Sequence, residues 1–436
     1  MQYIPQVLFS ILLILGIGLF ANNVKKLSRN IKLGKDVDVS DNRPQRWKNM
    51  AKIALGQTKM VVRPIAGFLH IIVYVGFIII NIEVLEIVVD GIFGTHRIGL
   101  SVLNKSIYGF LIGSFEVLAV LVLISVILFW IRRNIIKIKR FLSAEMTGWP
   151  KNDGNIILYF EVVLMCLFLI MNATDTSFQN LASGNVVSQF IAPLFSGMAE
   201  TTLHIVERTA WWIHIIGILA FLNYLYFSKH LHILLAFPNT FYGKLRPKGQ
   251  FLNNEAVTKE VKLMMDPSAD PFAAPAEDAP VPEKFGASDV MDLNWVQLLN
   301  AYTCTECGRC TSECPANQTG KKLSPRKIMM DTRDRLVEVG KNIDTNKGTF
   351  VPDGKQLLGD YISNEELWAC TSCNACVQAC PVSIDPLSII MDMRQYLVME
   401  QSAAPSDLNN MMGNIENNGA PWPFNQQDRL NWSNES

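Results

Sequence analysis

Five long apolar runs dominate the first 240 residues of this 436-residue chain. They cover roughly residues 4–21, 65–89, 107–131, 156–173 and 209–227. At about 1.5 Å of rise per helical residue, each run is long enough to cross a hydrocarbon core of roughly 30 Å. The sequence therefore predicts an all-α fold in which residues 1–240 form a bundle of five transmembrane helices.

The positions of basic residues predict how this bundle is oriented. Segments 22–64, 132–154 and 228–250 hold 21 Lys and Arg residues, whereas segments 90–106 and 174–208 hold 3. Cytoplasmic loops carry the excess of Lys and Arg. We therefore expect a multi-pass protein of the bacterial cytoplasmic (inner) membrane, with its N-terminus outside and residues beyond 240 in the cytoplasm. Positive charge follows the first run, which indicates an uncleaved anchor, and Asn185–Glu207 is expected to form an interfacial or partly buried helix.

Eight of the nine cysteines lie in two copies of one motif after residue 300. Cys304–Pro315 reads CTECGRCTSECP and Cys370–Pro381 reads CTSCNACVQACP, so each copy is C-x2-C-x2-C-x3-C-P. This is the bacterial ferredoxin run, in which three closely spaced cysteines bind one [4Fe–4S] cluster and the fourth ligates the other cluster. A structural zinc site would need only two C-x2-C pairs. The third cysteine and the Cys-Pro, both repeated, favour two iron–sulfur clusters.

The spacing predicts which cysteines share a cluster. One set contains Cys304, Cys307, Cys310 and Cys380; the other contains Cys370, Cys373, Cys376 and Cys314. About 55 residues separate the two copies, and Pro325–Val339 within them has apolar residues near helical spacing. Residues 291–400 therefore resemble the α-helical ferredoxins of heterodisulfide reductase, anaerobic glycerol-3-phosphate dehydrogenase and the succinate dehydrogenase iron–sulfur subunit.

Histidines near the cytoplasmic ends of the second and fifth runs could hold a haem. Bis-histidine haem b in a bundle needs two imidazoles from different helices at one depth. His70 and His232 meet that requirement. His214 precedes His232 by 18 residues, or five helical turns, which predicts that both project from one face of the same helix. His230 is two residues off that face and is expected to meet water, a propionate or lipid headgroups.

A family resemblance supports the haem and adds an open question. Trp212–Tyr242 resembles the fifth helix of the respiratory nitrate reductase gamma subunit, whose two haem-ligating histidines match His214 and His232. Gly67–Gly76 resembles that family's second helix, with His70 at the inner-haem ligand, but Ile80 stands at the outer-haem position. One haem b between His70 and His232 is expected, a second is left open, and His214 could instead bind a quinone.

The basic residues expected at the inner membrane surface have two possible interpretations. Arg63, Lys59 and Lys229 could neutralise haem propionates, or they could simply reflect the bias of cytoplasmic loops towards Lys and Arg.

The remaining segments predict a tether and a docking tail. Residues 241–290 form a linker, whose stretch 266–284 is rich in Pro, Ala and acidic residues and favours an extended tether. Residues 401–436 are rich in Asn, Gly and Pro and would be disordered alone. Asn414–Trp432 resembles the segment that joins such ferredoxins to cysteine-rich CCG domains, which predicts partner docking. No Cys-Cys pair occurs in the sequence, so a CCG module is expected on a separate polypeptide.

Together these patterns predict an electron-transfer subunit in the lipid membrane. Electrons would pass between a cytoplasmic partner, the two clusters, haem b and the quinone pool; the partner would be a CCG-domain subunit or a flavoprotein donor. The only catalysis the chain itself would perform is quinone chemistry, and no catalytic residue is predicted. The alternative is a membrane-anchored redox sensor or assembly factor without quinone turnover. With a formal net charge of zero, no nucleic-acid partner is expected.

Overall fold

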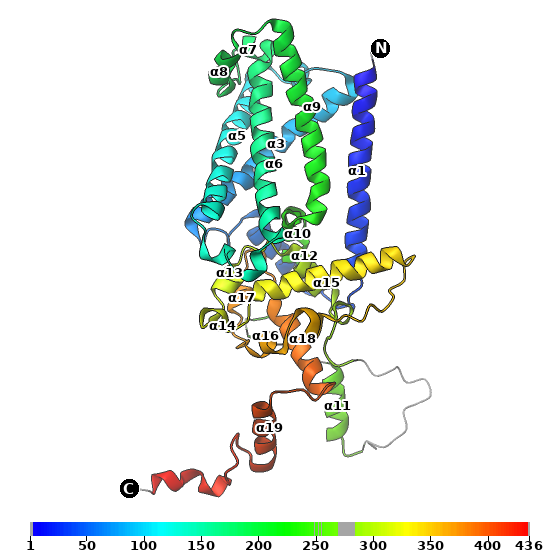
Figure 1. The fold of residues 1–436 in the computed structure, drawn as a ribbon, viewed down its shortest axis with the longest axis vertical. Helices are drawn as coiled ribbons and strands as arrows, with labels where there is room; N and C mark the ends of the chain where they lie inside the picture. The colour runs from blue at the N-terminus through cyan, green and yellow to red at the C-terminus, as the bar shows by residue number, and fades with distance from the viewer. Residues whose placement is uncertain (1–2, 248, 252, 254, 269–283, 435–436) are drawn as a thin grey trace.

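The computed structural model describes residues 3–247, 249–251, 253, 255–268 and 284–434. These residues form helices, with two isolated β-bridges and no extended strand among them, so the all-α prediction is confirmed. Figure 1 shows an upright bundle with the cysteine-containing domain against one end and the N-terminus at the other.

Five helices are long and apolar enough to cross a membrane, as predicted. They are α1 (Ile4–Ile31), α3 (Pro64–Phe93), α5 (Lys105–Asn134), α6 (Trp149–Thr174) and α9 (Glu200–Tyr224). Proline near the first position starts α1, α3 and α6, where its missing N–H costs no hydrogen bond. The Asn104 side chain caps α5, and Gly94 ends α3 in the left-handed conformation.

The fifth span is not one continuous helix up to His232, and this corrects the sequence argument. After α9 come two short 3-10 turns, η5 (Leu225–Phe227) and η6 (Lys229–Leu231), with extended Ser228 between them. Asp153 of α6 accepts hydrogen bonds from the Tyr224 hydroxyl (2.6 Å) and the Lys229 backbone N–H (3.1 Å) across this break. His232 starts a separate helix, α10 (His232–Phe241), so His214 and His232 do not share a face of one helix.

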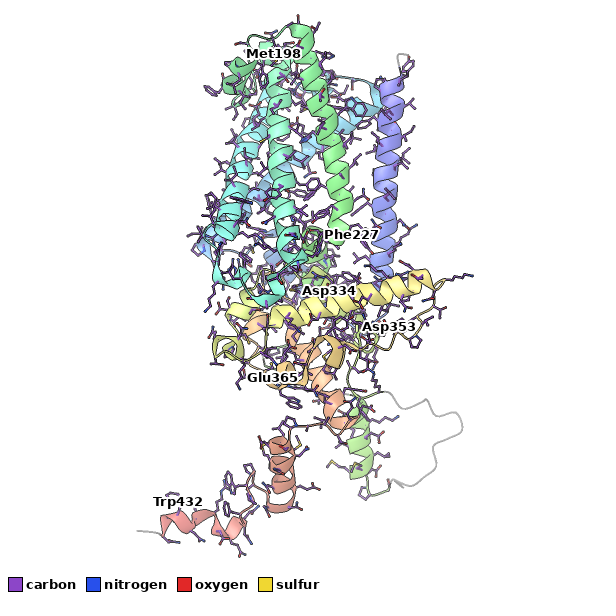
Figure 2. All side chains as sticks on the ribbon, in the orientation of Figure 1. Met198, Phe227, Asp334, Asp353, Glu365 and Trp432 are labelled. Carbon is purple, nitrogen blue, oxygen red and sulfur yellow. The ribbon has the colours of Figure 1, made fainter. Side chains whose placement is uncertain are left out.

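The outer segment also differs in part from its prediction. Only α8 (Ser188–Ile191) and the 3-10 turn η4 (Ala192–Phe195) lie across it, and α9 already begins at Glu200. The helix of the fifth span therefore begins nine residues, or about two and a half turns, before the apolar run. In Figure 2, Met198 lies near the end of the bundle far from the cysteine domain, and Phe227 lies near the end close to it.

Short helices fill the loops. On the cysteine-domain side they are α2 (Arg43–Met50), η1 (Ala51–Leu55), η2 (Lys139–Phe141) and η3 (Ala144–Met146); on the other side they are α4 (Gly99–Val102) and α7 (Thr176–Asn180). The linker contains α11 (Glu255–Met265), while most of its predicted tether, residues 269–283, lies outside the described residues.

The cysteine domain is built on two long amphipathic helices, α15 (Pro325–Thr345) and α18 (Pro386–Met399), capped by Ser324 and Asp385. Around them lie η7 (Val290–Asp292), α12 (Trp295–Thr303), α13 (Arg309–Ser312), α14 (Pro315–Gln318), η8 (Leu357–Tyr361), α16 (Asn364–Trp368) and α17 (Ala375–Ala379). One hydrophobic core joins this domain to the adjacent ends of the spans, because Leu27, Phe221 and Leu231 belong to the same cluster as Leu298 and Ile328.

The C-terminal segment contains two helical stretches. It forms α19 (Ser406–Asn418) and a 3-10 segment, η9 (Gln426–Ser433), neither of which buries a side chain. Figure 1 shows both extending away from the rest of the molecule.

Candidate functional site

The two cysteine motifs form matching loops. In each copy, the residues on either side of the second cysteine adopt left-handed backbone conformations: Glu306 and Gly308 in the first, Ser372 and Asn374 in the second. Helices α13 and α17, which carry Cys310 and Cys376, pack against each other. The internal repeat of the sequence is therefore also a structural repeat, with its two copies side by side.

The fold brings the cysteines together in the two crossed sets that the spacing predicts. Burial raises the pKa of the Cys310 thiol, and repulsion from Cys304, Cys307 and Cys380 raises it further. Likewise, burial raises the pKa of the Cys376 thiol, and repulsion from Asp385, Cys370 and Cys314 raises it further. Cys376 also acts on Cys310, so the two sets are adjacent.

These sulfurs fit iron–sulfur clusters better than single zinc ions. Burial raises the pKa of Cys304 to about 12 and that of Cys380 to about 11, so binding as thiolates requires a strongly cationic centre. No three cysteine sulfurs in the described part of the chain lie within 4.8 Å of one another, whereas a zinc ion at about 2.3 Å from each sulfur would draw them closer. Backbone N–H groups of Ser372 and Ile384 point at the sulfurs of Cys370 (3.4 Å) and Cys380 (3.3 Å).

A group of three histidines lies above the first motif. His70 of α3 lies close enough to His232 for their charges to interact, and His230 lies close to both. The His230 and His232 rings meet edge to face at 5.5 Å. The sequence argument placed His230 off the ligand face because it assumed a continuous helix.

The chemistry of these nitrogens fits axial ligands of a haem. The Nδ1 atom of His232 lies 3.0 Å from the Lys229 carbonyl oxygen, an arrangement that leaves Nε2 free to bind a metal. The Nδ1 atom of His70 is buried and has no hydrogen-bond partner among the residues that the structure describes. An orphaned buried imidazole is costly, which favours a ligand at this position.

Contacts between loops place the first motif directly below these histidines. Arg309 of the motif is close enough to His70 to act on it electrostatically, and it donates to the Lys59 carbonyl oxygen at 2.8 Å. The Lys59 amine in turn donates to the Cys380 carbonyl oxygen at 3.2 Å. The histidines and the first cysteine set are therefore linked through two side chains.

His214 and Arg63 lie apart from the histidine group. His214 is 3% exposed and packs against Phe168, and its Nδ1 atom has no hydrogen-bond partner within the described part of the chain. Arg63 donates to the Ser312 hydroxyl (2.7 Å) and pairs with Glu313 (3.0 Å) beside the first motif. These contacts anchor the cysteine domain, and the propionate role of Arg63 stays a prediction.

Sequence reasoning missed a buried ion-pair junction between the two halves. Glu306 of the first motif pairs with Lys229 and with Arg333 of α15. Burial opposes ionisation of Glu306, but the two cations together lower its pKa. Since the partners lie 77 and 27 residues away from Glu306, no local pattern could reveal this junction.

A second polar group, also missed, lies at the opposite end of the bundle. Asp175 pairs with Arg97 (2.7 Å) and His96 (3.2 Å), and Arg97 also donates to Asn172 (2.9 Å). Glu116 accepts from Asn172 at 3.1 Å. These contacts join the spans at the end of the bundle far from the cysteine domain.

Comparison with known proteins agrees with the cysteine geometry. Residues 303–384 match the family model of the 4Fe-4S dicluster domain. A probable iron-sulfur-binding oxidoreductase FadF of Bacillus subtilis is 29% identical over 98% of this chain and 61% of its own length. An EtfAB:quinone oxidoreductase of Syntrophomonas wolfei is 26% identical over 94% of this chain and 57% of its own length.

Other relatives match over shorter stretches. A probable membrane-anchored ferredoxin of Chromohalobacter salexigens is 33% identical over 36% of this chain and 25% of its own length. Heterodisulfide reductase subunits of Methanosarcina species match about a quarter to a third of this chain. No solved structure matches.

The chain thus spans about three fifths of the length of the first two relatives. It carries a 4Fe-4S dicluster domain joined to five helices that can span a membrane, and its relatives are electron-transfer iron–sulfur oxidoreductases.

Proposed function

We propose that this chain relays electrons between a cytoplasmic redox partner and the quinone pool. The observation that carries the proposal is the proximity of the first cysteine motif to the histidine group: Arg309 lies close enough to His70 to act on it electrostatically, and Lys59 connects Arg309 to Cys380. A redox centre in the soluble domain would lie next to one in the membrane. That adjacency suits a relay, whereas a sensor would need no second centre.

The proposed ligands follow the crossed cysteine sets. Cys304, Cys307, Cys310 and Cys380 would hold one [4Fe–4S] cluster, and Cys370, Cys373, Cys376 and Cys314 the other. Each cluster supplies reversible one-electron transfer when bound. The chain's own backbone N–H groups at Cys370 and Cys380 would stabilise negative charge on the sulfurs.

His70 and His232 would bind one haem b at the same end of the bundle. The Lys229 carbonyl fixes the His232 ring, and the orphaned nitrogen of His70 supports a ligand there. A gamma-type cytochrome b architecture, as in nitrate reductase, is part of this proposal.

The proposed orientation and partners rest on charge and on relatives. The cysteine domain docks against the basic loops, and the distribution of Lys and Arg supports a cytoplasmic position for it, with the N-terminus outside. Relatives named as heterodisulfide reductase subunits support a CCG-domain redox partner, and a relative named as a quinone oxidoreductase supports quinone as substrate. A flavoprotein is proposed as the electron donor.

Quinol-driven reduction of the purified full chain tests the relay. Decylubiquinol or menadiol added anaerobically should reduce both the haem, seen by optical spectroscopy, and the clusters, seen by electron paramagnetic resonance. Dithionite gives the full signal for reference. If dithionite reduces both centres and neither quinol reduces either of them, the relay is wrong and the sensor alternative gains support.

A further inference from the structure

A pocket at the inner end of the bundle lies beside both groups of proposed redox ligands. Its volume is about 690 Å³, within the range of small-molecule sites, roughly 300–1,000 Å³. Its walls come from the last turns of α1, from α10 and from α12.

We propose that this pocket binds the head of a membrane quinone. The inference rests on the relay described above and adds the location of its substrate. A quinone head is a flat ring with two carbonyl oxygens, so it requires apolar walls and a few hydrogen-bond donors.

The pocket offers both. Val24, Leu235 and Leu299 are among its apolar lining residues. The Tyr242 and Trp295 rings, which meet edge to face at 4.8 Å, supply aromatic surface.

Its donors are free to bind a ligand. Ser28, Tyr242 and Trp295 line the pocket, and their side-chain O–H and N–H groups make no hydrogen bond within the described residues. Two such donors would satisfy the two carbonyl oxygens of a quinone.

The position of the pocket suits electron transfer. Leu299 of α12 lies five residues before Cys304, the C-cap of that helix. At about 1.5 Å of rise per residue, the two residues are separated by about 8 Å along the helix axis. Leu235 lies one helical turn after His232 on α10. A quinone head between these walls would therefore lie close to the first cysteine set and close to the histidine group.

Access from the membrane is also available. The pocket wall continues along α1 to Ile17, which is exposed and lies seven residues, or about two helical turns, before Val24 and therefore on the same face of the helix. An isoprenoid tail could lie against this surface within the lipid.

The charge at the pocket favours a neutral head over a phospholipid. Lys32 and Asp36 both line the rim, and their opposite formal charges leave the site without a net positive charge to hold a phosphate. Both side chains are exposed to solvent. Oxidation of one quinol breaks its two O–H bonds, releases two protons to water at this rim and yields two electrons, one for each cluster; reduction is the reverse.

Two substitutions test the site. Val24→Trp should fill the pocket and Tyr242→Phe should remove a donor. Each should slow menadiol-dependent reduction of the clusters at least tenfold, while dithionite still reduces them fully and the iron content is unchanged. Leu19→Trp is the matched control, since Leu19 is exposed on α1 outside the pocket and should leave the rate unchanged.

A binding measurement makes the test independent of turnover. A photoreactive azidoquinone should label peptides from α1, α10 or α12 in the wild-type chain, and Val24→Trp should reduce that labelling. Unchanged rates and labelling in both variants, labelling confined to the region of His214, or a phospholipid retained in the pocket with wild-type rates in the variants would each overturn the inference. A wild-type chain that no quinol reduces would instead overturn the relay itself.

Discussion

At the scale of single residues, the cysteine sets allow a direct test of ligation. Replacing Cys307 or Cys373 by Ser should remove one cluster, because each belongs to a different crossed set and a hydroxyl is a poor iron ligand. Iron per chain should fall from about eight to about four. Metal analysis of the purified variants measures the iron content. The absorbance near 400 nm should fall by roughly half.

The control for this experiment is Cys166→Ser. Cys166 lies in α6, remote in sequence from both motifs, and is the one cysteine not assigned to a cluster. Full iron content in Cys307→Ser and Cys373→Ser alike would refute the assignment.

The histidines allow a second residue-scale prediction. His70→Ala or His232→Ala should abolish the low-spin b-type spectrum, because each removes one axial ligand. His214→Ala and His230→Ala should retain it. A pyridine haemochrome assay should return one haem per chain.

Two results would change this picture. Two haems per chain would make His214 an axial ligand. Loss of the spectrum in His230→Ala but not in His232→Ala would show that His230 is the axial ligand in place of His232. The break in the helix brings the His230 ring near His70.

Asp175 on the outer side gives a pH-dependent prediction. Burial alone would raise its pKa, but the hydrogen bond from His96 and the charge of Arg97 hold the pKa well below its usual range. Asp175→Asn leaves Arg97 buried without its partner and should cost about 3–5 kcal/mol of stability at pH 7.

The sign of the pH effect follows from the lowered pKa. The stabilisation by Asp175 is complete above the unfolded value, about 3.9, and is lost as pH falls through the folded pKa. Thermal unfolding should therefore show a clear gap between wild type and Asp175→Asn at pH 7, and the gap should narrow as the pH falls below about 4. A gap that grows further below that pH would contradict the ion-pair account.

At the scale of elements, the end of α1 clamps the cysteine domain to the membrane half. The backbone N–H of Lys35 donates to Leu293 (2.8 Å), and the N–H of Trp295 donates to Lys35 (3.1 Å). A Cβ at Gly34 would meet the Trp295 nitrogen at 2.7 Å and the Leu293 oxygen at 2.8 Å. Only glycine allows this approach without a backbone shift.

Gly34→Ala should therefore loosen the domain. We expect a loss of roughly 1–3 kcal/mol, as for overpacking, and faster protease cleavage between α1 and α2. Gly18→Ala is the matched control, because nothing lies within 4 Å of a Cβ there. Equal cleavage of the two variants would show that the clamp does not hold the domain.

At the scale of the whole molecule, the arrangement predicts one topology. The cysteine domain contacts the loops that carry most of the Lys and Arg residues, so domain and loops must lie on the same side of the membrane. Green fluorescent protein fused after Ser436 should fluoresce, because it folds in the cytoplasm. Alkaline phosphatase fused after Gly197 should be active, because that loop lies at the other end of the bundle.

The reverse pattern of reporter activities would overturn the orientation. It would also place the cysteines in an oxidising compartment, where free thiols form disulfides and reduced iron–sulfur ligands are not maintained.

The sequence alone determined the features that depend on neighbours along the chain. Apolar runs of about 20 residues identify the five spans because a helix must match the thickness of the membrane. Cysteine spacing identifies the dicluster domain, since three thiols within seven residues can cap one cluster.

Only the tertiary structure decided how these parts meet. The break at Ser228 depends on Asp153 of another span, so helical periodicity along the fifth run could not predict the break. For the same reason it could not predict that His230 lies near the other two histidines. The Lys229–Glu306–Arg333 junction and the clamp at Gly34 join residues far apart in sequence. Such contacts are set by packing and by the pairing of buried charges, for which composition and local spacing carry no signal.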